Sequence, residues 1–195
     1  MLVKQFDQYI LMDIPLPGRM VVLIVRYWLI GILPLIITIR HGGSLIPRKH
    51  IVAQIVTGVG IGAFMSTVFT LTPTLLGLGD WVDNGHHYTE LWQFIYEFVY
   101  CIVAVGLVEE FIFRGFVFGK LIELGSSENV AITASSLLFG FFHFLGGNVV
   151  QIIVTTFLGA FFCLCRKKVP YCSLLSLVIA HGIYDALITV WASVL

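Results

Sequence analysis

Residues 91–116 read LWQFIYEFVYCIVAVGLVEEFIFRGF, an apolar run in which only Glu97, Glu109, Glu110 and Arg114 carry charge. An α-helix rises about 1.5 Å per residue, so about 20 apolar residues cross the hydrocarbon core of a bilayer. This run is long enough to cross. We therefore expect a transmembrane helix that carries ionisable side chains inside the membrane.

The composition of the whole chain also favours a membrane protein. Of its 195 residues, 58% are hydrophobic and only 11% are charged, whereas soluble domains carry about 25% charged residues. Further apolar stretches of suitable length are 21–39, 51–78, 129–146, 148–165 and 172–195. Spanning segments must satisfy their backbone polar groups internally. The sequence therefore predicts an all-α, polytopic transmembrane helical bundle of about six spans.

No internal repeat or polar linker divides this series of stretches. We expect an interfacial or irregular lead-in over residues 1–20 and a single transmembrane domain over 21–195, with a catalytic core over about 91–195. Eleven basic and eleven acidic residues cancel, so nucleic acid is not expected as a partner. The partner is the lipid bilayer, in a multi-pass arrangement, and the short chain favours a prokaryotic cell membrane. The sequence does not specify an oligomeric state.

Lys and Arg gather in alternate connections between the apolar stretches, and the positive-inside rule places those connections in the cytoplasm. These residues are Arg40, Arg48, Lys49, Lys120, Arg166, Lys167 and Lys168.

Ionisable side chains inside spans are energetically expensive, so each is a candidate for function. They fall in three runs: Glu109-Glu110-Phe111-Ile112-Phe113-Arg114, Phe139-Gly140-Phe141-Phe142-His143 and His181-Gly182-Ile183-Tyr184-Asp185. Residues four apart on a helix share a face. We therefore expect Glu110 to pair with Arg114, and Asp185 to orient His181.

Adjacent helical residues point about 100° apart. We therefore expect Glu109 to serve a different neighbour from Glu110 and to point into a cavity. Extending the helix of residues 91–116 to about Leu124 places Glu109 level with His143. Glu97, earlier on the same helix, is interpreted as an interfacial acid whose carboxylate snorkels to the membrane surface, with a role in gating substrate entry as the alternative.

The three runs resemble the motifs of the CAAX-protease and bacteriocin-processing family of intramembrane endopeptidases, also called abortive-infection proteins. That family is marked by Glu-Glu-x-x-x-Arg, Phe-x-x-x-His and His-x-x-x-Asn/Asp, and all three stand here in order between Leu91 and the C-terminus. The resemblance implies an all-helical core with a water-filled site, in which Glu109 and His143 activate water. The implied substrate is a membrane-associated or prenylated protein or peptide.

Amide hydrolysis needs a nucleophilic water, a base and a group that stabilises the oxyanion. We expect Glu109 with His143 to be the base and His181 to serve the oxyanion. Asp185 stands where many members of that family carry Asn, and it would orient His181 rather than donate a hydrogen bond itself. Glu110 and Arg114 are expected to support the site.

The sequence leaves the metal dependence open. Glu109, His143 and His181 would together form a zinc triad with an open fourth position, as catalytic zinc sites require. Because no His-Glu-x-x-His pair is present on one helix, we favour metal-free, glutamate-type catalysis, with zinc as the alternative cofactor.

Two other classes of protein also carry ionisable residues within the membrane. One is a proton-coupled transporter or ion-conducting protein, and the lack of an inverted repeat argues against it. The other is a non-enzymatic immunity or scaffold protein that keeps the fold without the activity. The complete set of motif residues argues against that second class.

Overall fold

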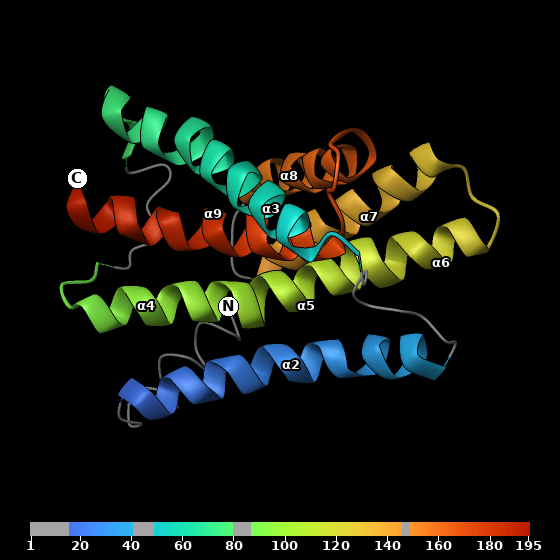
Figure 1. Ribbon diagram of the computed structural model, residues 1–195, viewed down its shortest axis with the longest axis horizontal. Helices are drawn as coiled ribbons and strands as arrows, with labels where there is room; N and C mark the ends of the chain where they lie inside the picture. Colours follow the sequence, from blue (N-terminus) through green and yellow to red (C-terminus); the bar gives the residue numbers. More distant parts are fainter. Residues whose placement is uncertain (1–15, 41–48, 80–86, 146–148) are drawn as a thin grey trace. The chain divides into compact units, whose positions relative to one another are not determined.

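The computed structural model describes residues 16–40, 49–79, 87–145 and 149–195, and in these ranges all regular secondary structure is helical (Figure 1). The predicted all-α fold is confirmed. Most of the lead-in expected over residues 1–20 lies outside the described residues, but the helix expected from residue 21 begins at Leu16.

The chain divides into two compact units. One, called here the α7–α8 unit, consists of Met1–Leu45 and Phe111–Val169. The other, called the α3–α9 unit, consists of Ile46–Glu110 and Pro170–Leu195. The interpretation of residues 21–195 as a single domain stays a prediction.

The α3–α9 unit is built on α3 and α9, which pack along each other (Figure 1). Near one end of the pair, Ser176 Oγ donates a hydrogen bond of 2.9 Å to the carbonyl of Gln54. Near the other end, Trp191 Nε1 donates one of 2.8 Å to Ser66 Oγ. Such polar contacts hold membrane helices together where lipid supplies no hydrophobic driving force. The elements of this unit are α3 (Ile51–Ser66), the π-helical segments η1 (Thr67–Leu71) and η2 (Thr74–Leu78), α4 (Leu91–Tyr100), the π-helical segment η4 (Cys101–Gly106), α5 (Leu107–Glu110) and α9 (Leu174–Val194).

The α7–α8 unit contains a helical hairpin of α7 and α8, which lie side by side. The hydroxyl of Ser127 caps the start of α7 by accepting a hydrogen bond from the backbone N–H of Val130. The elements of this unit are α2 (Leu16–Arg40), the π-helical segment η5 (Phe111–Val117), α6 (Phe118–Glu123), α7 (Glu128–Phe142), the 3₁₀ turn η6 (His143–Leu145) and α8 (Val149–Lys168).

Helices long and apolar enough to cross a membrane are found at Gly18–Thr38, Ile51–Leu78, Val149–Lys168 and Leu174–Val194. Much of the surface of these helices consists of large, exposed apolar side chains. A surface of this kind is unfavourable in water and suits lipid. The chain is therefore an integral membrane protein.

The two other predicted spans end at different residues from the apolar runs that predict them. The helical run that begins at Leu91 continues to Glu123, which confirms the extension to about Leu124. The span predicted over 129–146 is too long, because α7 ends at Phe142. His143 therefore lies at the C-terminal cap of α7, where the chain tightens into the 3₁₀ turn, rather than inside the helix.

Candidate active site

Glu109 and Glu110 lie on α5, a single α-helical turn enclosed by the π-helical segments η4 and η5. Segments of π-helix are rare and occur often at functional sites. Both side chains are buried, with exposed fractions of 1% and 0%. Because a buried carboxylate is costly unless it is paired or hydrogen-bonded, the groups around α5 determine what these two residues do.

His181, on α9, lies beside both glutamates. Its Nδ1 is 2.8 Å from Glu110 Oε1, a hydrogen-bond distance, and its Nε2 is 3.8 Å from Glu109 Oε2. The expectation that the adjacent glutamates serve different neighbours is wrong. An imidazole presents nitrogens on two sides of its ring, so a single His181 can contact both.

Asp185 lies one turn further along α9. Its Oδ2 is 3.3 Å from His181 Nε2, so the contact expected between these two residues is present. The Asp185 side chain is 29% exposed, while that of His181 is 6% exposed. Asp185 therefore forms the accessible edge of an otherwise buried cluster, which we call the His181 cluster: Glu109, Glu110, His181 and Asp185.

A close approach between η4 and α9 brings this cluster together. A Cβ atom added to Gly182 would lie 2.5 Å from Ile102 Cα, and one added to Gly106 would lie 2.6 Å from the carbonyl oxygen of Val178. Real Cβ atoms do not approach other atoms so closely. Only glycine fits at these two positions, and the backbones they bring together carry Glu109, Glu110 and His181 on neighbouring turns.

The α7–α8 unit holds the other two candidate residues. The guanidinium of Arg114 is buried, with its central carbon 4.2 Å from the ring centre of Phe139 and 5.4 Å from that of Phe162. These distances fit cation–π contacts, which stabilise a cation away from water. Gly159 leaves room for this side chain, because a Cβ there would lie 3.1 Å from Arg114 Nη2.

His143 has its Nδ1 2.9 Å from the backbone carbonyl of Phe139. A carbonyl oxygen only accepts, so Nδ1 carries the proton, and in the neutral ring Nε2 keeps its lone pair. The expected pairs Glu109 with His143 and Glu110 with Arg114 stay predictions.

Comparison with known proteins adds one match. Residues 91–187 match the family described as Type II CAAX prenyl endopeptidase Rce1-like. The chain belongs to the CAAX-protease family. None of the curated proteins and none of the solved structures that were compared matches it. Membership in the CAAX-protease family identifies the general activity as that of an intramembrane endopeptidase.

Glu97 is a buried residue that the sequence interpretation placed wrongly. It is only 6% exposed, so it does not snorkel to the membrane surface. Its carboxylate accepts hydrogen bonds of 3.0 Å from Tyr88 Oη and 3.0 Å from Thr189 Oγ1, and the Cys101 thiol lies 3.8 Å away. Of these partners, only Cys101 can be predicted from the sequence, because it lies four residues from Glu97 on the same helical run.

The sequence predicts Glu109, His143 and His181 as the ligands if the protein binds zinc. Within the described ranges, no group of three or more His, Cys, Asp or Glu side chains is arranged to hold a metal ion. The dependence of the reaction on zinc stays a prediction. What the His181 cluster does offer is a set of carboxylates that can take a proton and an imidazole that can donate one.

Proposed function

We propose that this CAAX-family protease cleaves its substrate by glutamate-type catalysis, with a water molecule activated by Glu109. The observation that supports this proposal is the buried cluster in which Glu110 and Asp185 flank the His181 ring and the Glu109 carboxylate lies 3.8 Å from Nε2. A single water can bridge two groups at that separation.

Glu110 has the role of positioning His181. An ionised carboxylate only accepts hydrogen bonds, so His181 Nδ1 donates to Glu110 Oε1 across the 2.8 Å contact. This contact fixes the ring with Nε2 toward Glu109 and Asp185. With carboxylates facing both nitrogens, the ring donates from Nε2 as well, and that donor stabilises the oxyanion that forms on the substrate carbonyl.

The reaction then proceeds in two steps. The oxygen of the bound water attacks the carbonyl carbon of the scissile bond while its proton passes to Glu109, which gives a tetrahedral intermediate whose oxyanion faces His181. As the C–N bond breaks, Glu109 returns the proton to the departing nitrogen. The products are a new carboxyl terminus and a free amine.

We assign His143 a share of the base role beside Glu109 because it is the histidine of the Phe-x-x-x-His motif. Its protonated Nδ1 is bound to the Phe139 carbonyl, so the neutral ring offers Nε2 as an acceptor. Arg114 is assigned a supporting role, because its charge is held by aromatic rings inside the fold.

The substrate class we propose is a membrane-associated peptide that carries a prenyl group. A lipid chain gains about 0.8 kcal/mol per buried CH₂ group, so it concentrates a peptide at the bilayer that surrounds the protease. The description of the matched family names prenyl endopeptidases, which favours this anchor over other lipid groups.

The test is a cleavage assay with detergent-purified protein and one peptide sequence in prenylated and unmodified forms. The assay is run in isotopically labelled water, with and without a chelator, beside a determination of bound zinc. The proposal predicts one labelled oxygen in the new carboxyl terminus, faster cleavage of the prenylated peptide, and a rate that the chelator leaves unchanged. Loss of cleavage with the chelator, restored by zinc, would overturn the glutamate-type assignment, and no cleavage of either peptide would overturn the substrate class.

A further inference from the structure

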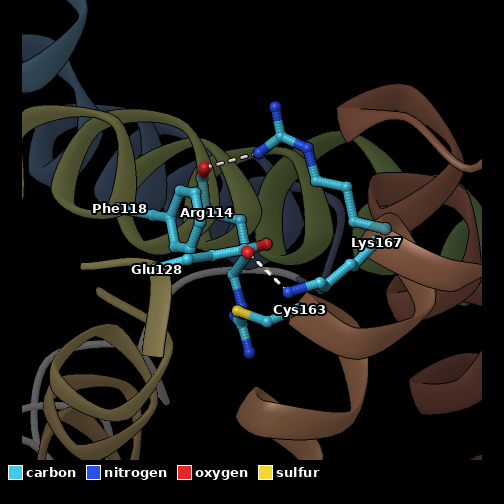
Figure 2. Close-up of a pocket in the computed structure, with 6 residues that line it drawn as sticks. Arg114, Phe118, Glu128, Cys163 and Lys167 are labelled. Atoms are coloured by element: carbon cyan, nitrogen blue, oxygen red, sulfur yellow. Dashed lines mark hydrogen bonds and ion pairs between the residues drawn. The ribbon is translucent and has the colours of Figure 1, made fainter. Parts of the chain in front are cut away.

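A pocket lies near the end of α8, wholly within the α7–α8 unit (Figure 2). We call it the basic pocket. Its volume is about 230 Å³, and its lining residues are Arg114, Phe118, Glu128, Cys163, Arg166 and Lys167. Of these residues only Arg114 has a part in the proposed chemistry, and that part is a supporting one.

The length of α8 indicates where the basic pocket would lie in a bilayer. The spanning helix α8 runs from Val149 to Lys168, and its 20 residues have a length of about 30 Å, the thickness of the hydrocarbon core. Arg166 and Lys167 occupy its last turn. A helix that fills the bilayer core places its last turn at the boundary between acyl chains and headgroups.

The charges of the pocket are unequal and held in place. At the end of α8 its lining contains two cations, Arg166 and Lys167, against the single anion Glu128, while the guanidinium of Arg114 is held by aromatic rings. Arg166 Nη1 donates a hydrogen bond of 2.8 Å to the carbonyl of Arg114, and Lys167 Nζ lies 2.5 Å from Glu128 Oε2, the two contacts drawn in Figure 2. Arg166 makes this contact through Nη1, and its guanidinium carries further donors at Nε and Nη2.

Arginine is the side chain best suited to bind phosphate, since its planar donors match the phosphate oxygens. The volume of the pocket also limits the size of its ligand. A single water molecule needs a cavity of only about 10–15 Å³, and pockets for drug-sized ligands begin at about 300 Å³. The volume of about 230 Å³ is therefore suited to a headgroup and too small for a whole peptide. The ring of Phe118 supplies an apolar contact for the glycerol or acyl carbons beside the phosphate.

We propose that the basic pocket binds the phosphate of an anionic phospholipid headgroup in the leaflet where α8 ends. Arg166 is the principal phosphate contact, and Lys167, partly neutralised by Glu128, contributes less. Anionic lipid at this position would hold the ends of α8, α7 and α6 together. Basic pockets between helices are a known basis of headgroup recognition.

The test measures retention of phosphatidylglycerol by native mass spectrometry, after reconstitution in phosphatidylcholine bilayers with and without that lipid. The variants are Arg166→Gln and Lys167→Gln. The matched control is Lys168→Gln, which removes the same charge from the same helical turn but not from the pocket lining. A second arm adds inorganic phosphate as a soluble competitor, and unfolding temperatures establish that each variant is folded.

The expected result is that the parent and Lys168→Gln retain phosphatidylglycerol equally, while Arg166→Gln loses affinity about fivefold or more, as the loss of one cation near a headgroup predicts. Lys167→Gln should lose less than Arg166→Gln. Equal losses in Lys168→Gln and Arg166→Gln would overturn the proposal, because the attraction would then belong to the charged surface. Complete displacement by an equimolar amount of inorganic phosphate would also overturn it, since the lipid part of the ligand would then add nothing to the binding of a free anion.

Discussion

Replacing Gly182 by alanine tests whether the close approach of η4 and α9 holds the His181 cluster together. The new Cβ atom would lie 2.5 Å from Ile102 Cα, and ordinary van der Waals contact begins at 3.4 Å, so the two backbones must separate by about 0.9 Å. If that movement is along the line from His181 Nδ1 to Glu110 Oε1, their distance grows from 2.8 Å to about 3.7 Å and the hydrogen bond is lost.

The expected losses follow from that displacement. A misplacement of about 1 Å in a catalytic arrangement costs about a hundredfold in rate. Inserting a methyl group into a packed interface costs about 1–3 kcal/mol of stability. The measurement is kcat/KM for peptide cleavage beside thermal unfolding in detergent.

Gly60→Ala is the matched control, because no atom lies within 4 Å of a Cβ built on Gly60 of α3. Alanine there should keep the parent rate and raise stability by up to about 1 kcal/mol, as expected for glycine replaced in a helix. If Gly182→Ala is folded and cleaves as fast as the parent, the close approach of η4 and α9 does not position the cluster.

Three further outcomes follow from the contacts outside the His181 cluster. Glu97→Gln, which loses a buried carboxylate that accepts from Tyr88 and Thr189, should lower the free energy of unfolding by about 1–3 kcal/mol in detergent titrations. Burial raises the pKa of the Tyr88 hydroxyl, and the nearby Glu97 carboxylate raises it further. The stability that the neutral hydroxyl contributes is therefore fully present below about pH 10, the pKa of tyrosine in the unfolded chain. It declines as the pH rises toward the higher pKa of Tyr88 in the folded protein. Unfolding temperatures of the parent should therefore fall at alkaline pH more than those of Tyr88→Phe, and parallel curves would contradict this. Phe139→Leu removes the ring 4.2 Å from Arg114 and should cost about 2 kcal/mol or more of stability, whereas a cost below that of an ordinary core substitution would argue against the cation–π contact.

The sequence alone predicts the helices well, because their signal is local. Apolar stretches of spanning length occur where α2, α3, α8 and α9 form, and the run beyond Phe116 was apolar enough to extend that helix to Glu123. The sequence also identifies the candidate site residues one by one, since each is an ionisable side chain inside an apolar run.

Contacts within the site were harder to predict, because they depend on features that periodicity does not report. Glu109 and Glu110 share one neighbour because the His181 imidazole presents a nitrogen on each of two sides, and the spacing of residues along one helix does not reveal such a contact. The burial of Glu97 cannot be predicted from local spacing, because Thr189, one of its partners, lies 92 residues away along the chain. The position of His143 at the cap of α7 reflects where that helix ends, and helix ends are the least certain part of any reading from sequence.

The most direct measurement of the proposed mechanism is the single-turnover cleavage rate of Glu109→Gln on the prenylated peptide. The amide keeps the size of the side chain but cannot take a proton from water, so cleavage should fall by about a hundredfold to ten-thousandfold while the unfolding temperature stays near that of the parent. Glu123→Gln is the matched control, since it makes the same chemical change at an exposed position on α6 and should cleave at the parent rate. Cleavage by Glu109→Gln at a rate close to that of Glu123→Gln would contradict the assignment of Glu109 as the base.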